Sequence, residues 1–161
     1  MAGRGGKSGA GAVAGARASL TPRTPAGYSG TPLAKKLGVK DGQRTWRWRM
    51  PASVGEEIAE GGVSPVLLRT PTAGLEMAHV FVTRKLELAE VVDRLRALLA
   101  PDGTIWVSWP KKASGVATDV TEDVVRDVAL PLGLVDIKVC AVDATWSGLK
   151  LVIRKSERRP A

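Results

Sequence analysis

The amino-acid sequence predicts a single α/β domain whose sheet is mostly parallel, with helices on both faces and an antiparallel strand pair at the C-terminal end. Three observations predict this fold class. From residue 76 onward, apolar stretches of strand length alternate with amphipathic helical stretches. In the stretch 104–109 the apolar residues point to both sides, as in a strand covered on both faces. Residues 134–146 and 149–154 form two strand patterns separated by only two residues, which favours an antiparallel pair.

The first element after the N-terminal segment is predicted to be a short helix over 31–37. Thr31 is a favourable N-cap, and Pro32 suits the first helical position because no N–H donor is needed there. Leu33 and Leu37 lie four residues apart on one face, and Gly38 favours the end of the helix.

Residues 43–50 predict a strand, because tryptophan and methionine alternate with polar residues in QRTWRWRM. The next stretch is less regular. Residues 55–62 favour a short helix, and 63–69 favour a short strand that Pro65 restricts to the edge of the sheet. The arrangement of 44–75 stays open at this stage.

The following region predicts a strand, a helix and a second strand. MAHVFVT, residues 77–83, is an apolar run of strand length. The stretch 88–99 has the spacing of one apolar helix face, and Pro-Asp-Gly at 101–103 predicts a turn into the strand 104–109. The apolar helix positions are Leu88, Val91, Val92, Leu95, Leu98 and Leu99.

A second amphipathic helix is predicted over 121–132. Thr121 is its expected N-cap, and the acidic residues of its first turn complement the positive helix end. Gly133 ends the helix before the antiparallel pair, whose turn is predicted at Ser147–Gly148.

The ends of the chain differ from this domain. Residues 1–27 are mainly Gly, Ala, Ser, Thr and Pro, with four basic and no acidic residues, which predicts a disordered basic arm. The single α/β domain is expected over 28–154 and a basic C-terminal tail over 155–161. The chain carries a net charge of +8, yet 28–153 contains 16 basic and 15 acidic residues. The excess positive charge therefore lies at the ends.

Cys140 is the only cysteine, so no internal disulfide is possible and a reducing, cytoplasmic location is expected. Apolar runs fall short of the ~20 residues that span a membrane, so no membrane partner is predicted. The stretch AGAVAGARA is too interrupted for a secretory signal. His79 is the only histidine, and with no cysteine cluster beside it the sequence predicts no metal site.

Three stretches resemble a bacterial family of small proteins of unknown function. They are YSGTPLAKKLG (28–38), WVSWPKKASG (106–115) and VCAVDATWSGLKLVIR (139–154). The resemblance covers about 27–154 and implies no particular activity. The element order of the second half is also similar to that of class I S-adenosylmethionine-dependent methyltransferases, which implies a Rossmann-like, methyltransferase-like fold.

The cofactor pattern of those enzymes is not matched here. In them, a glycine-rich turn follows the first strand and an acidic residue ends the second. MPASVGEE, residues 50–57, contains one glycine, and LLRTP, residues 67–71, contains no acid. Arg47 and Arg49 are also unusual in a strand covered on both faces. The sequence therefore identifies no cofactor.

The predicted topology gathers several segments at one edge of the sheet. Successive parallel strands end at the same edge, and open α/β sheets usually bind ligands there. Lysines would supply charge, serine and glycine would allow close backbone approach, helix starts would offer N–H groups, and tryptophans could stack on a base or sugar. The candidate ligand-binding residues are Ser29, Gly30, Thr31, Trp109, Lys111, Lys112, Ser114, Gly115, Trp146 and Ser147.

No catalytic residue can be assigned, because the chain has one histidine and no nucleophile or phosphate-loop motif. The leading hypothesis is a non-catalytic, methyltransferase-like module that binds an anionic, phosphate-bearing or nucleotide-like ligand at the carboxyl edge. One alternative is an S-adenosylmethionine- or nucleotide-dependent enzyme with a degenerate loop near 50–57. Another is a nucleic-acid accessory protein that binds through its basic tails.

Overall fold

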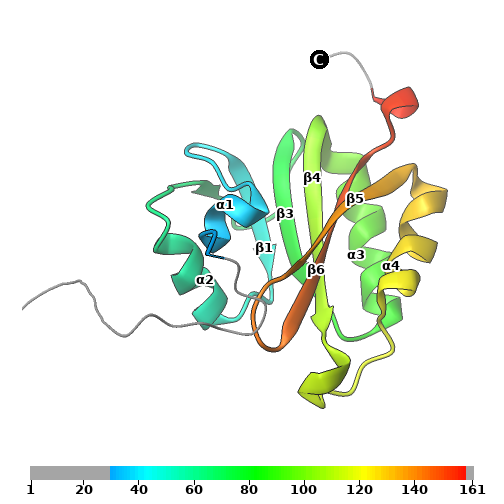
Figure 1. Ribbon diagram of the computed structural model, residues 1–161. Coiled ribbons are helices and arrows are strands. Elements are labelled where there is room, and N and C mark those ends of the chain that lie inside the picture. Colours follow the sequence, from blue (N-terminus) through cyan, green and yellow to red (C-terminus); the bar gives the residue numbers. More distant parts are fainter. Residues whose placement is uncertain (1–29, 159–161) are drawn as a thin grey trace, which may run out of the picture.

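A computed structural model describes residues 30–158, which form a six-stranded sheet with helices on both sides (Figure 1). The strand order is β2-β1-β3-β4-β6-β5. The strands β2, β1, β3 and β4 are parallel to one another, whereas β6 is antiparallel to both β4 and β5. The predicted mostly parallel sheet with a C-terminal antiparallel pair is confirmed. The predicted arm over 1–27 and the last three residues of the tail lie outside the described residues.

The strands are β1 (Arg44–Trp48), β2 (Val66–Leu67), β3 (Leu75–Phe81), β4 (Leu99–Pro110), β5 (Leu134–Ala141) and β6 (Trp146–Ile153). The α-helices are α1 (Leu33–Leu37), α2 (Ala52–Ala59), α3 (Lys85–Leu98) and α4 (Glu122–Ala129). Short 3-10 turns follow at η1 (Lys112–Ser114), η2 (Leu130–Leu132) and η3 (Lys155–Glu157).

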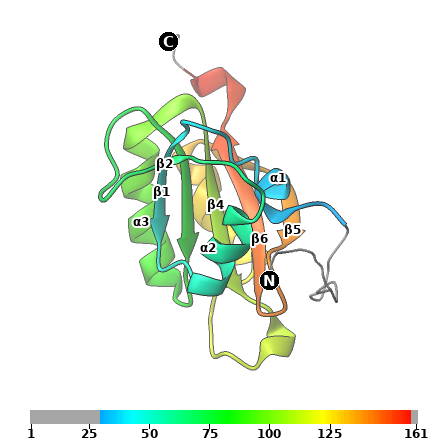
Figure 2. The same cartoon turned by 90° about the vertical axis from the view of Figure 1, so that its left-hand side faces the viewer.

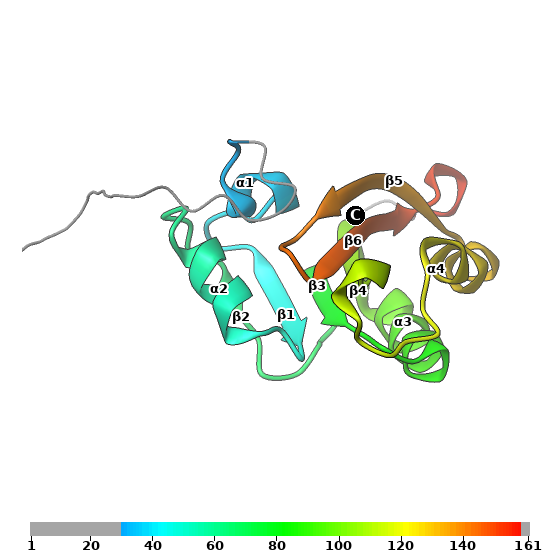
Figure 3. The same ribbon diagram turned by 60° about the horizontal axis from the view of Figure 1, so that its bottom comes forward.

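The two faces of the sheet carry different helices. Figure 3 shows α1 and α2 on one side and α3 and α4 on the other. The first layer joins α1 and α2 to Met77, Phe81 and Trp106. The second joins α3 and α4 to the opposite side chains of the same strands, including Val80 and Val107. None of the helices in 30–158 is long and apolar enough to cross a membrane.

Trp106, at the middle of β4, is fully buried between its neighbours and α1. Its indole N–H donates to the carbonyl oxygen of Leu37 at 2.8 Å. The acceptor lies in the last turn of α1, where carbonyl groups have no partner within the helix. One side chain therefore supplies apolar contact and also fixes the end of α1 on the sheet.

The N-cap of helix α1 lies one residue later than predicted. Pro32 occupies the N-cap position, and Thr31 makes no side-chain cap. Gly38 ends the helix in the left-handed conformation, as predicted, with φ of 77°. At α4 the prediction is confirmed in detail, because the Thr121 side chain accepts a hydrogen bond from the N–H of Val124.

The region that the sequence left open forms β1, α2 and β2. Helix α2 starts three residues before the predicted stretch 55–62. Strand β2 has only two residues and lies at the edge, next to Pro65, as the proline indicated. Both of its residues are exposed.

Two predicted turns are wrong. Strand β4 begins at Leu99, directly after α3, so 101–103 belong to its irregular start, where the register with β3 shifts. The β5–β6 turn lies over 143–145, and Ser147 and Gly148 are inside β6. The Asp143 carboxylate makes this turn by accepting hydrogen bonds from two backbone N–H groups, both at 2.8 Å.

Gly148 is needed for close packing rather than for a turn. A Cβ atom there would lie 3.1 Å from Val142 and 3.3 Å from the Trp106 ring. We expect Gly148→Ala to lower the free energy of unfolding by about 1–3 kcal/mol, because buried groups must shift. Urea unfolding measures this change.

Gly55→Ala is the matched control. Gly55 lies in α2, and an added Cβ would make only an ordinary contact with Met50 at 3.8 Å. This variant should be as stable as the wild type or more stable, by up to about 1 kcal/mol. Equal losses in both variants would contradict the packing role of Gly148.

Candidate functional site at the carboxyl edge

The carboxyl edge of the sheet is stepped. Strands β1 and β3 end at Trp48 and Phe81, whereas β4 continues to Pro110, which pairs with Trp146 at the start of β6. Figure 3 shows this edge toward the viewer. The strand order also reverses between β1 and β3, because β2 lies beyond one and β4 beyond the other. Such a reversal is where open α/β sheets commonly bind ligands.

The segment 111–115 lies at this edge, where β4 ends. The N–H of Lys111 donates to the carbonyl oxygen of Thr145 at 2.7 Å, which ties the segment to the β5–β6 turn. Ser114 donates its hydroxyl to the carbonyl oxygen of Lys111 at 2.7 Å, so it stabilises the turn itself. Gly115 ends the turn with φ of 76°, and Lys112 is exposed.

The two candidate tryptophans lie on opposite faces of the sheet. Trp109 is only 7% exposed and packs in the core beneath α3 and α4. Trp146 is half-buried and meets Phe81 edge-on, with ring centroids 5.0 Å apart. Ser147 pairs with Trp109 inside the sheet. Trp146 is thus the more accessible ring for a ligand at this edge.

The segment before α1 stands apart from the lysines. Gly30 and Thr31 precede α1 on the other helical layer, and no hydrogen bond joins either to 111–115 within residues 30–158. Ser29 lies outside the described residues.

Two of the helix starts at this edge, those of α3 and α4, already have a side-chain cap. The Asp119 carboxylate accepts a hydrogen bond from the N–H of Lys85, at the start of α3, at 2.7 Å. Thr121 caps α4 by accepting from Val124 at 3.2 Å. Helix α2, which follows β1 at the same edge, has Pro51 at its N-cap position and no side-chain cap. An anion beside α3 and α4 must therefore be held by side chains, and only the start of α2 is left without a side-chain cap among these three helices.

Several basic side chains at the carboxyl edge have no ion-pair partner, although carboxylates also lie there. These carboxylates are engaged elsewhere: Asp119 and Asp143 accept backbone N–H groups, and Glu87 pairs with Arg49 at 2.8 Å. The acidic residues of the first turn of α4 pair with Arg126. Five basic side chains have neither a hydrogen bond nor an ion pair through their charged groups within 30–158. They are Arg47, Arg84, Lys85, Lys111 and Lys112.

A buried polar group lies beside this edge, under α1 and α2. His79 Nε2 lies 2.7 Å from Ser108 Oγ, and the His79 ring stacks on Phe81 at 4.5 Å. Burial, and then the charge of Arg47 on the neighbouring strand, lower the pKa of His79 to about 3. The imidazole is therefore neutral at pH 7. Burial also lowers the pKa of Arg47 itself.

Sequence reasoning missed the His79–Ser108 pair. It noted Arg47 as unusual and His79 as an unsupported metal ligand. A usable signal was present, because each residue is a polar position flanked by apolar residues within its strand. Among residues 30–158, no three His, Cys, Asp or Glu side chains come together as metal ligands would.

The exit from β1 differs from a glycine-rich cofactor turn. Residues 49–51 are Arg, Met and Pro, and Arg49 has a φ of 58°, a left-handed conformation that non-glycine residues rarely adopt. No acidic residue follows β2 directly, since the next residues are Leu68 and Arg69.

The fold can be placed among known structures. The magnesium protoporphyrin IX methyltransferase ChlM of Synechocystis, with S-adenosylhomocysteine bound, matches with a TM-score of 0.51 at 11% identity, over 75% of this chain and 80% of that one. A ribosomal protein L11 methylase of Lactobacillus delbrueckii matches at 0.49 and 10% identity, over 76% and 75%. LepI, a protein with S-adenosylhomocysteine bound, matches at 0.47 and 10%, over 76% of this chain but 39% of LepI.

These similarities show the fold alone. The chain has the Rossmann-like fold of methyltransferases, and it spans well under half the length of LepI. No protein-family model matches the sequence, and no curated protein does.

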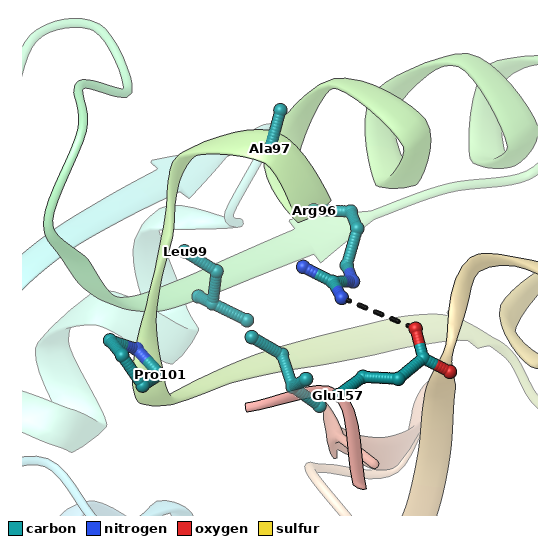
Figure 4. Close-up of a pocket in the computed structure, with 6 residues that line it drawn as sticks. Arg96, Ala97, Leu99, Pro101 and Glu157 are labelled. Carbon is teal, nitrogen blue, oxygen red and sulfur yellow. Dashed lines mark ion pairs between the residues drawn. The ribbon is translucent and has the colours of Figure 1, made fainter. Parts of the chain in front are cut away.

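A separate cavity lies at the opposite, amino edge of the sheet (Figure 4). It measures about 680 Å³. Arg96 Nη2 and Glu157 Oε1 face each other across it at 3.6 Å. Gly133 leaves room for this carboxylate, since a Cβ there would lie 2.3 Å from Oε1. The lining residues are Arg96, Ala97, Leu99, Pro101, Ile153 and Glu157, none of which the sequence placed in the candidate site.

The neutral state of His79 makes the stability of the protein depend on pH. Its pKa is about 3 in the folded protein and near 6.5 when unfolded. Between these values only the unfolded chain binds the proton, so stability falls as pH decreases from about 6.5 to 3. The contribution is about 1.4 kcal/mol per pH unit for one proton.

Replacing His79 by glutamine separates this proton from those of the carboxylates. Glutamine keeps a nitrogen near Ser108 but cannot titrate. Between pH 6.5 and 3, we expect the free energy of unfolding of His79→Gln to fall less steeply with pH than that of the wild type. The difference in slope should be close to about 1.4 kcal/mol per pH unit, the value for one proton. Urea unfolding at a series of pH values measures this, and equal slopes would contradict a buried neutral His79.

Proposed function

We propose that the protein is a non-catalytic, methyltransferase-like module that binds an anionic, phosphate-bearing or nucleotide-like ligand at the carboxyl edge. One observation carries the proposal. Five basic side chains lie along this edge without an ion-pair partner in the described part of the chain, while the carboxylates beside them are engaged. Placing cations together without counter-ions is unfavourable, and a bound anion offsets that repulsion.

The stepped edge supports a small ligand rather than a flat surface contact. Lys111 and Lys112 stand at the end of the longer strand β4, and Arg47 lies lower, on β1, facing α1 and α2. Because these cations lie at different levels along the strand direction, they suit a ligand with more than one charged oxygen. A guanidinium contributes paired donors to a phosphate, and lysine contributes point charge.

The same geometry argues against catalysis. The single histidine is 2% exposed and neutral, and its Nε2 is engaged with Ser108. Asp119 and Asp143 hold backbone N–H groups instead of standing free as general bases. The turn after β1 has no glycine and begins with the bulky Arg49.

Replacing both lysines tests the proposal. We expect adenosine diphosphate or inorganic pyrophosphate to raise the melting temperature of the wild type in a saturable way. The Lys111→Ala/Lys112→Ala variant should lose at least about tenfold in affinity, because two charge-assisted contacts disappear. Calorimetric titration at constant ionic strength measures the change.

A matched control removes two lysines from the opposite edge. Lys40 and Lys155 are exposed and lie at the amino edge, before β1 and after β6. The Lys40→Ala/Lys155→Ala variant has the same net charge as the test variant and should bind as the wild type does. Equal losses in both variants would mean that net charge, not a site, is responsible.

The same titrations separate the alternatives. Micromolar binding of S-adenosylmethionine would favour an enzyme and overturn the non-catalytic assignment. Oligonucleotide binding that falls steeply with salt and is lost when residues 1–27 are deleted would favour an accessory protein acting through its arm.

A further inference from the structure

The face of the sheet near β1 is only partly covered by a helix. Trp46 of β1 is buried in one cluster with Leu88 and Val91 of α3, whereas β2, at the edge of the sheet, has exposed side chains. Figure 2 shows β1 and β2 at the sheet edge nearest the viewer. Beyond Arg44, the side chains on this face are apolar: Trp46 and Trp48 from β1, with Val66 and Leu68 from the β2 segment. Val66 is 47% exposed.

A cavity of about 320 Å³ opens between β1 and α3 on this face. Its aromatic side consists of Trp46 and Trp48, whose rings are nearly parallel with centroids 6.4 Å apart. Its polar side is the first half of α3. The lining residues are Trp46, Trp48, Arg49, Glu87, Glu90, Val91 and Arg94.

Arg49 shows what chemistry this cavity accepts. Its guanidinium lies 4.2 Å from the centre of the Trp48 ring, and its Nη1 lies 2.8 Å from Glu87 Oε2. A planar cation between an aromatic face and a carboxylate is a favourable arrangement. Arg49 reaches it only from a left-handed backbone, with φ of 58°, which is strained for a residue with a side chain.

The arrangement is incomplete at Glu87. Its Oε1 atom is buried and has no hydrogen-bond partner within residues 30–158. An arginine pairs best with a carboxylate when two parallel N–H groups meet both oxygens. Arg49 fills only one of them, and an unfilled buried acceptor is unfavourable.

We propose that this cavity is a binding site for an arginine side chain of a partner polypeptide. The incoming guanidinium replaces Arg49 over Trp48 and engages both oxygens of Glu87, with Glu90 adding negative charge and Arg94 lying at the far side. Displaced Arg49 is released from its strained contact. Exposed Val66, beside half-buried Leu68, supplies the apolar surface against which the partner backbone lies.

Arginine fits this cavity better than other cations. Its flat guanidinium stacks on an aromatic ring and presents a fork of donors, whereas lysine presents a compact ammonium that does neither as well. The cavity volume suits one side chain rather than a large ligand. This inference does not depend on the anion site, because Lys111 and Lys112 contribute nothing to the cavity.

The test uses an acetylated, amidated Gly-Arg-Gly-Gly peptide and its citrulline counterpart, which has the same shape without the charge. Binding is followed by calorimetry at constant ionic strength, with unfolding curves confirming that each variant is folded. We expect the arginine peptide to bind and the citrulline peptide to bind at least about tenfold more weakly. Equal binding of both peptides would overturn the proposal.

Removing the internal cation gives the decisive comparison. Arg49→Gly opens the cavity and accommodates the left-handed backbone, so it should bind the arginine peptide about tenfold more tightly than the wild type. Absence of a gain would overturn the proposal. Glu87→Gln, which keeps the side-chain shape, should abolish the gain when combined with Arg49→Gly.

Two control variants test whether the arginine peptide binds in the cavity. Asp93→Asn removes one negative charge from an exposed position of α3 that does not line the cavity, and it should bind the peptide as the wild type does. Lys111→Ala/Lys112→Ala should also leave peptide binding unchanged. Loss of binding in either control would show that general charge governs the interaction and would overturn the site.

Discussion

The arrangement of the whole molecule depends on the burial of Trp106. This side chain fills the layer between β4 and α1, and its N–H satisfies the carbonyl of Leu37 at the end of that short helix. Deleting a buried tryptophan typically costs about 3–5 kcal/mol, a large fraction of the stability of a small domain. The space it needs is provided by Gly148 on the adjacent strand. The positions of α1 and β6 next to β4 thus depend on the bulk of Trp106 and on the absence of a side chain at Gly148.

Much of the fold could be read from the sequence because its strongest signals are periodic. The apolar faces of α3 and α4, the cap at Thr121 and the buried pattern of 104–109 each reflect a local rule that packing does not override. The predicted turn at Ser147–Gly148 was wrong because glycine occurs both in turns and where two elements pack closely. Ser147–Gly148 has the composition of a turn, but the glycine was required for contact with Trp106, and an aspartate made the turn four residues earlier.

The candidate site was harder to predict for a different reason. Topology places Lys111, Lys112 and Trp146 at one edge, and that could be inferred from the strand order. Capping could not be inferred, because Asp119 serves a helix that begins 34 residues earlier in the chain. The cavity between β1 and α3 was equally hidden, since the isolated sequence does not reveal how far α3 covers β1 or which oxygen of Glu87 has no hydrogen-bond partner among the described residues.

The hydrogen bond from the start of α3 to Asp119 has a mechanical consequence. The loop after β4 carries the two lysines and, a few residues later, the carboxylate that holds the first turn of α3; Glu87 lies in that same turn. This contact fastens the loop after β4 to the turn of α3 that carries Glu87. The position of the Glu87 backbone therefore depends on a carboxylate far from it in the sequence, and a change at Asp119 would alter the start of α3 without touching any residue of the helix itself.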